Sequence, residues 1–142
     1  MSKVKVVTIG LGYIGLPTSA LIAQSGIHVH GVDVNQHVVN TINQGKIHIV
    51  EPSLDIAVQE AVRKGFLQAD LKPVEAETYL IVVPTPFKGN HEPDISYVES
   101  ATTSILSFLK EGDLFIIEST SPVGTTEKMM NLIYGKRPDL RG

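Results

Sequence analysis

The chain has 142 residues and no cysteine. It therefore holds no disulfide scaffold, no thiolate metal site and no cysteine nucleophile of its own. With 12 Lys and Arg against 15 Asp and Glu, the net charge of −3 gives no electrostatic footprint for nucleic acid or an anionic membrane. No apolar run is as long as a membrane-spanning helix, which needs about 20 residues. The N-terminus lacks the apolar segment of a signal peptide. We expect a cytoplasmic protein with neither a nucleic-acid nor a membrane partner.

Hydrophobic residues make up 42% of the chain and charged residues 19%, which indicates one globular domain with a packed core. Apolar runs predict strands, and 3.6-residue patterns between them predict helices. Asn35 and Ser53 are expected N-caps, and Gly26, Gly45 and Gly65 are expected helix stops. The expected strands cover 3–10, 28–34, 78–84 and 113–120, and the expected helices cover about 14–25, 36–44, 53–64, 95–109 and 124–134.

This alternation of strands and helices is typical of right-handed βαβ units. It predicts an α/β fold: a Rossmann-type, doubly wound parallel sheet with helices on both faces, formed as one dinucleotide-binding domain over residues 1–142. A further strand is expected after the last helix of a complete doubly wound domain. We therefore expect this chain to be a truncated form of a longer protein.

Three glycines, Gly10, Gly12 and Gly15, lie between the first expected strand and the first expected helix. This is the context that the dinucleotide-binding motif requires. The first glycine permits a tight turn, the second lets the backbone approach a pyrophosphate, and the third lets the helix pack on the strand. The N–H groups of Tyr13 and Ile14 then face the ligand at the positive end of the helix dipole.

Asp33 closes the second expected strand, 18 residues after Gly15. An acid at this place accepts hydrogen bonds from the adenosine ribose hydroxyls and repels a 2′-phosphate, which favours NAD over NADP. The alternative is that the glycines serve only a tight turn and that Asp33 only caps the next helix. Thr85 follows the strand that ends near Pro84, where topology allows a cofactor contact, although a plain turn is the alternative.

Metal binding is not expected. The five histidines are dispersed along the chain, cysteine is absent, and no HExxH motif is present. After the strand at 113–120, Gly124 allows a turn, and Thr125 and Thr126 open the last expected helix. Either threonine is compatible with an ordinary N-cap or with an anion contact.

Five segments, GLGYIGLP (10–17), GVDVNQ (31–36), HIVEP (48–52), VPTPFKGNHEPD (83–94) and ESTSPVGTTEK (118–128), occur in this order. Together they resemble the N-terminal part of the UDP-glucose/GDP-mannose dehydrogenase family, and the resemblance covers essentially the whole chain. The third and fourth segments look particularly like the branch that oxidises UDP-N-acetyl-D-mannosamine.

The resemblance implies an NAD-dependent enzyme that oxidises C6 of UDP-N-acetyl-D-mannosamine to the uronate by two hydride transfers to two NAD. It implies NAD contacts at Thr85 and Thr126, and a role for Thr120 in ordering water or substrate. It further implies that the catalytic cysteine and lysine, a central domain and a UDP-sugar domain lie beyond residue 142, that the full-length protein is a homodimer, and that this fragment alone is inactive.

Three alternatives stay open. The chain is compatible with the NAD domain of a related UDP-glucose or UDP-N-acetylglucosamine 6-dehydrogenase, or with a free-standing dinucleotide sensor that performs no chemistry. A β-hydroxyacid or 6-phosphogluconate-type dehydrogenase shares the glycine loop, but is not expected to carry the segment at 83–94.

Overall fold

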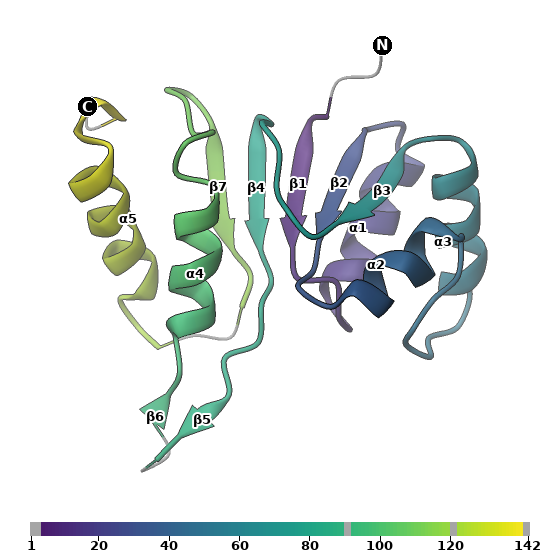
Figure 1. Cartoon of the computed structure of the whole chain (residues 1–142), viewed down its shortest axis with the longest axis horizontal. Coiled ribbons are helices and arrows are strands. Elements are labelled where there is room, and N and C mark those ends of the chain that lie inside the picture. The colour runs from purple at the N-terminus through teal and green to yellow at the C-terminus, as the bar shows by residue number, and fades with distance from the viewer. Residues whose placement is uncertain (1–3, 90–91, 120–121, 141–142) are drawn as a thin grey trace.

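A computed structural model describes residues 4–89, 92–119 and 122–140 of the chain. Five parallel strands form one sheet, in the order β3 (Leu67–Asp70), β2 (Val29–Val32), β1 (Val6–Ile9), β4 (Thr78–Ile81) and β7 (Leu114–Ile117) (Figure 1). Val6 at the start of β1 pairs with Val29 of β2 and with Thr78 of β4, so the central strands begin level with one another. The order reverses between β1 and β4, as it does in a doubly wound Rossmann fold. The predicted fold class is therefore confirmed.

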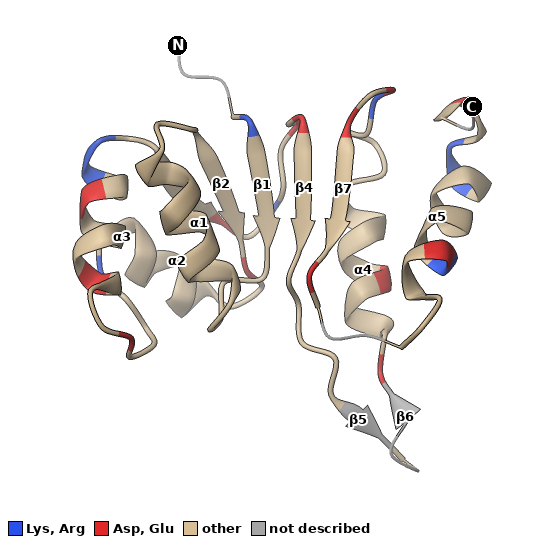
Figure 2. Cartoon of the chain, turned by 180° about the vertical axis from the view of Figure 1, so that it is seen from behind, with Lys and Arg blue, Asp and Glu red and all other residues tan. Residues whose placement is uncertain are grey.

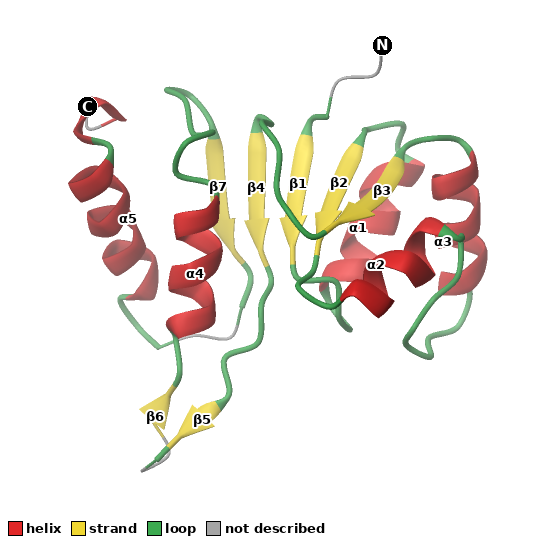
Figure 3. Cartoon of the chain, viewed as in Figure 1, coloured by secondary structure: helices red, strands yellow, loops and turns green. Residues whose placement is uncertain are grey.

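Strands and helices alternate along much of the chain, with two exceptions to the predicted alternation: two helices follow one another between β2 and β3, and no helix separates β3 from β4 (Figure 3). The helices are α1 (Gly15–Gln24), α2 (Gln36–Asn43), α3 (Leu54–Arg63), α4 (Ser96–Ser104) and α5 (Thr125–Lys136), and a short 3-10 helix follows at Pro138–Leu140. A two-stranded antiparallel ribbon, β5 (Phe87–Lys88) and β6 (Glu92–Pro93), projects beyond the main sheet between β4 and α4.

Two hydrophobic clusters cover the two faces of the sheet because successive strand residues point to opposite sides. Val6 of β1 joins α1, α2 and α3 in one cluster, whereas its neighbour Val7 joins α4 and α5 in the other. Figure 2 shows α1 in front of β2 and α4 behind β7, with α3 and α5 at the two ends of the sheet. Apolar burial on both faces explains why β1 and β4 are near-continuous hydrophobic runs.

The segment 71–77, which connects β3 to β4, crosses one face of the sheet without forming a helix (Figure 1). Nε2 of His30 donates to the carbonyl of Lys72 over 2.9 Å, and Nδ1 of the same buried ring accepts from Gln68 over 2.9 Å. The N–H of Ala76 donates to the hydroxyl of Tyr79 over 2.9 Å. Burial raises the pKa of the Tyr79 phenol. These polar contacts fix a connection that has no regular structure of its own.

Some local expectations need correction. β3 was not among the expected strands, because it has only four residues and carries only two buried side chains, Leu67 and Ala69. α4 ends at Ser104, short of the expected residue 109. Ser53 is the N-cap residue of α3, as expected, but its side chain makes no cap hydrogen bond and its backbone is left-handed with φ of 66°. By contrast, Asn35 caps α2 by accepting from the N–H groups of His37 and Val38, as predicted.

Candidate functional site

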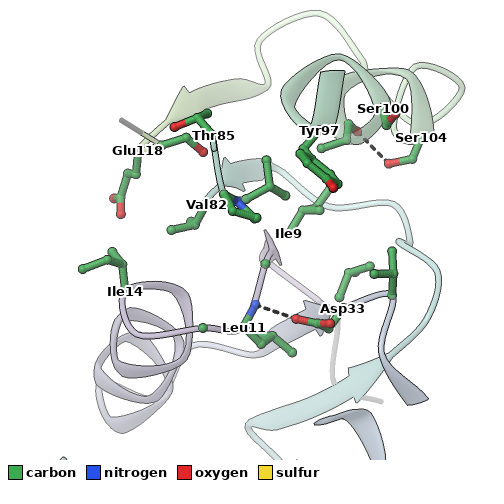
Figure 4. Close-up of a pocket in the computed structure, with 18 of the residues that line it drawn as sticks. Ile9, Leu11, Ile14, Asp33, Val82, Thr85, Tyr97, Ser100, Ser104 and Glu118 are labelled. Carbon is green, nitrogen blue, oxygen red and sulfur yellow. Dashed lines mark hydrogen bonds between the residues drawn. The ribbon is translucent and has the colours of Figure 1, made fainter. Parts of the chain in front are cut away.

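A cleft of about 640 Å³ opens at the carboxyl ends of the central strands, where the strand order reverses. The ends of β1, β2, β4 and β7 form its floor, and α4 and the 71–77 connection form its walls (Figure 4). In doubly wound sheets ligands bind at this place, because the connections on the two sides diverge there. The described residues that line it include Gly10, Gly12, Tyr13, Ile14, Asp33, Thr85, Tyr97, Ser100, Glu118 and Ser119.

The glycine turn after β1 is packed tightly at two of its three glycines. Gly10 has φ of 107°, and a Cβ there would collide with the carbonyl oxygen of Val82. A Cβ at Gly15 would collide with the carbonyl oxygen of Gly10. A Cβ at Gly12, by contrast, would meet no described atom within 4 Å. Packing inside the protein therefore explains why Gly10 and Gly15 have no side chain. It does not explain the absence of a side chain at Gly12, which lines the cleft.

The amino end of α1 faces the cleft without a cap. Ile14 is the N-cap residue, and its side chain forms no cap hydrogen bond. In the described ranges, no atom accepts a hydrogen bond from the N–H groups of Tyr13 and Ile14. The carbonyls of Gly12 and Ile14, by contrast, accept hydrogen bonds from N–H groups in the first turns of the helix. Tyr13 and Ile14 are 70% and 60% exposed, respectively. Uncapped helix N–H groups carry partial positive charge and form a site for an anion.

Asp33, at the end of β2, holds the glycine turn from the side. One carboxylate oxygen accepts from the N–H of Leu11 over 3.1 Å, and the other accepts from the N–H of Asn35 over 3.0 Å. The side chain is half-buried and lines the cleft. Asp33 thus joins the turn after β1 to the turn after β2, which sequence reasoning did not foresee. It does not cap α2, because Asn35 takes that role.

Thr85 and Glu118 lie at the other end of the cleft, after β4 and β7 (Figure 4). The backbone there is fixed: the N–H of Glu118 donates to the carbonyl of Ile81 over 2.8 Å, and the Ser119 hydroxyl donates to the same carbonyl over 3.3 Å. Thr120, the candidate for ordering water or substrate, lies outside the described residues.

The structure does not bring every candidate residue to the cleft. Gly15 lies behind the turn, and Thr126 is exposed in the first turn of α5, outside the lining. Gly124 is the N-cap residue of α5 with φ of 89°, so the alternative of an ordinary N-cap at Thr125 or Thr126 is wrong. The hydroxyl of Thr125 is buried and donates to the carbonyl of Pro122 over 2.8 Å.

Sequence reasoning missed the contribution of α4. Tyr97, Ser100 and Ser104 line the cleft, as do Leu71 and Pro73 of the 71–77 connection. The βαβ topology contained a signal for α4, because the helix that precedes a parallel strand begins at the carboxyl edge of the sheet. No comparable signal marked the 71–77 connection, because it has no regular structure.

The charged residues of the cleft are both acidic. Asp33 and Glu118 line it, and no Lys or Arg is present among the lining residues described. The described residues contain no group of three His, Cys, Asp or Glu side chains able to hold a metal ion. They also contain no helix that is both long and apolar enough to cross a membrane. An anion in this cleft would therefore be bound by backbone N–H groups.

Comparisons with known proteins agree with this geometry. Residues 4–141 match the model described as UDP-glucose/GDP-mannose dehydrogenase family, NAD binding domain. The UDP-N-acetyl-D-mannosamine dehydrogenase of Escherichia coli (strain K12) is 60% identical over 140 residues, which are 99% of this chain and 33% of that protein. The Salmonella typhi protein of the same name is 59% identical over the same share.

A solved structure of a protein with a similar name also matches this chain. The native structure of the UDP-N-acetyl-mannosamine dehydrogenase from Staphylococcus aureus superposes with a TM-score of 0.90 at 38% identity. The match covers 94% of this chain and 33% of that one. The chain therefore spans about a third of the length of the relatives that it matches.

Proposed function

Because the chain belongs to the UDP-glucose/GDP-mannose dehydrogenase family, as its NAD-binding domain, we propose that it serves a nucleotide-sugar 6-dehydrogenase. The proposed overall reaction oxidises UDP-N-acetyl-D-mannosamine to UDP-N-acetyl-D-mannosaminuronate with two NAD. Support comes from two relatives that are 59% and 60% identical and that carry the name of this dehydrogenase. The cofactor of the domain is NAD.

The observation that carries the proposal is the contrast among the three glycines. Gly12 is the one whose missing side chain leaves open space in the cleft, and the uncapped N–H groups of Tyr13 and Ile14 follow it directly. A pyrophosphate needs both features, close backbone approach and several N–H donors. The residues present therefore fit the diphosphate of NAD.

Each candidate residue has a proposed task. Gly10 and Gly15 shape the turn, Gly12 admits the pyrophosphate, and the N–H groups of Tyr13 and Ile14 bind it. Asp33 accepts from the adenosine ribose hydroxyls with the lone pairs left beside its two backbone bonds. Thr85 orients the other half of the cofactor at the end of β4. NAD, when bound, supplies the hydride acceptor.

The proposed roles of Thr126 and Thr120 rest on the family resemblance. Thr126 lies outside the cleft lining, so its proposed contact with NAD requires a movement of α5 or a ligand that extends beyond the cleft. For Thr120, we propose a role in ordering water or substrate beside the nicotinamide, on the strength of the family resemblance.

We place the remaining machinery outside these residues. The chain contains no cysteine, so a thiol nucleophile has to come from another segment. The matched relatives are about three times as long, which leaves room for a central domain and a UDP-sugar domain. A cytoplasmic homodimer is the proposed state of the full-length protein.

The test uses the full-length gene product with NAD and three substrates in parallel: UDP-N-acetylmannosamine, UDP-N-acetylglucosamine and UDP-glucose. NADH formation is followed by its absorbance. We expect the manno epimer to give the highest kcat/KM and two NADH for each uronate formed. Preference for another sugar would overturn the substrate assignment. NAD binding without turnover of any sugar would favour a dinucleotide sensor.

A further inference from the structure

Glu118 has no assigned task in the cleft, although its position is well fixed. It directly follows β7, and its N–H donates to the carbonyl of Ile81 over 2.8 Å. Its side chain is exposed and lines the cleft, and in Figure 4 its carboxylate extends toward the side where Ile14 lies. Among the described residues, no hydrogen bond or ion pair engages this carboxylate. Its negative charge is therefore available to a ligand.

The charges along the cleft form a pattern. Asp33 lies at the end of β2, the positive amino end of α1 lies at the centre, and Glu118 lies at the end of β7. The oxidised dinucleotide presents matching groups in the same order: ribose hydroxyl donors, an anionic pyrophosphate and a positively charged nicotinamide ring. The reduced dinucleotide lacks this last positive charge.

The sheet topology decides which end meets which acid. Under the proposed function, on which this inference rests, Asp33 holds the adenosine ribose and the pyrophosphate crosses the amino end of α1. The nicotinamide half then extends over β4 and β7, because the ligand spans the point where the strand order reverses. Ile14, which is 60% exposed, offers this half an apolar surface across from Glu118.

We infer that Glu118 is a specificity-determining residue that binds the nicotinamide end of NAD⁺ through its charge and favours the oxidised over the reduced cofactor. An opposite charge in a partly solvated cleft changes affinity by a modest factor, because water and salt screen it. The effect belongs to the nicotinamide half alone. ADP-ribose, which has the pyrophosphate and both riboses but no nicotinamide, should be insensitive to Glu118.

The test measures the Kd values of NAD⁺, NADH and ADP-ribose by calorimetry at low salt, with the full-length gene product and its Glu118→Gln variant. We expect NAD⁺ to bind about three- to tenfold more weakly to the variant, while NADH and ADP-ribose change by less than about twofold. Glu118→Lys should weaken the binding of NAD⁺ further. Its preference for NAD⁺ over NADH should be lower than that of the Glu118→Gln variant.

The matched control is Glu111→Gln. Glu111 is an exposed glutamate near the opposite end of β7, outside the cleft lining, so its loss should leave all three affinities unchanged. If Glu118→Gln weakens the three ligands equally, or leaves the ratio of NAD⁺ to NADH affinity unchanged, the inference is overturned while the proposed function stands. If the unaltered protein binds neither NAD⁺ nor ADP-ribose, the proposed function itself fails.

Discussion

The turn from β1 to α1 and the turn from β7 to α5 both join an apolar strand to a helix through glycine, but their surroundings differ. β1 lies between β2 and β4 with all four residues buried. β7 is the last strand of the described sheet, Leu114 is 53% exposed, and no described helix covers the face of β4 and β7 seen in Figure 2. The contrast is that the first turn follows a strand paired on both sides, whereas the second follows a strand that is paired on one side only among the described residues.

The largest expected difference between the two turns concerns their glycines. In Gly15→Ala the new methyl group meets the carbonyl oxygen of Gly10, a backbone atom of the same turn. We expect a loss of about 3 kcal/mol or more in the free energy of unfolding, measured by urea denaturation. A less stable alanine variant is the opposite of the usual result, because alanine is favoured over glycine within a helix by about 1 kcal/mol.

The partner variant is Gly124→Ala in the second turn. Gly124 has φ of 89°, but a Cβ there would meet no described atom within 4 Å. Only the left-handed backbone opposes the substitution, at a cost of about 1 kcal/mol. Equal losses for the two variants would show that the two turns are equally constrained, and the comparison would fail.

The second prediction concerns the strands themselves. Val7 of β1 is fully buried, whereas Leu114 of β7 is 53% exposed. We expect Val7→Ala to lower the free energy of unfolding by about 2–3 kcal/mol and Leu114→Ala to lower it by less than about 1 kcal/mol. Leucine loses more carbon atoms than valine, so side-chain size alone predicts the opposite order. Denaturation curves of both variants that showed the larger loss at Leu114 would mean that β7 is covered in solution.

The same contrast explains which features the sequence could predict. Around β1 the signals are local: a run of β-branched residues, three glycines and an acid at the end of the next strand. The structure places Gly12, Tyr13, Ile14 and Asp33 in one cleft with no further assumption. Asn35 and Gly26 likewise took their expected cap and left-handed conformations, because a cap or a turn depends on a few neighbouring residues.

The features that the sequence did not predict depend on contacts distant along the chain. β3 is a strand because Leu67 and Ala69 pack against α2 and α3, and its four residues are too few to show a clear period. The bond from Leu11 to Asp33 joins two turns 22 residues apart. Ser53 occupies the N-cap position that its residue type predicts, but with a left-handed backbone and no side-chain cap hydrogen bond.

The third prediction tests how each turn is held. Asp33→Ala removes the acceptor of the Leu11 and Asn35 N–H groups, and we expect a loss of about 1–2 kcal/mol because the site is partly solvated. Thr125→Val removes a single local bond to Pro122 at nearly constant shape, and should cost less than about 1 kcal/mol. Thermal unfolding of both variants measures the difference. If Asp33→Ala is no less stable than Thr125→Val, the long-range anchor is unimportant.

The smallest effect on stability is expected at Gly12, and its sign should be opposite. No described atom lies within 4 Å of a Cβ at this position, and its φ is outside the left-handed region. Alanine therefore fits the folded chain and reduces the freedom of the unfolded chain, which stabilises the protein by about 0.5 kcal/mol. The same methyl group occupies the space proposed for the pyrophosphate, so NAD should bind at least about tenfold more weakly.

Calorimetry with NAD and a denaturation curve on one Gly12→Ala sample separate these two results. A variant that is more stable and still binds NAD normally would show that the cofactor avoids this turn. A variant that loses both stability and binding would show that Gly12 is constrained by the fold in the way that Gly15 is. Higher stability with weaker binding is the outcome that distinguishes a glycine kept for a ligand from a glycine kept for packing.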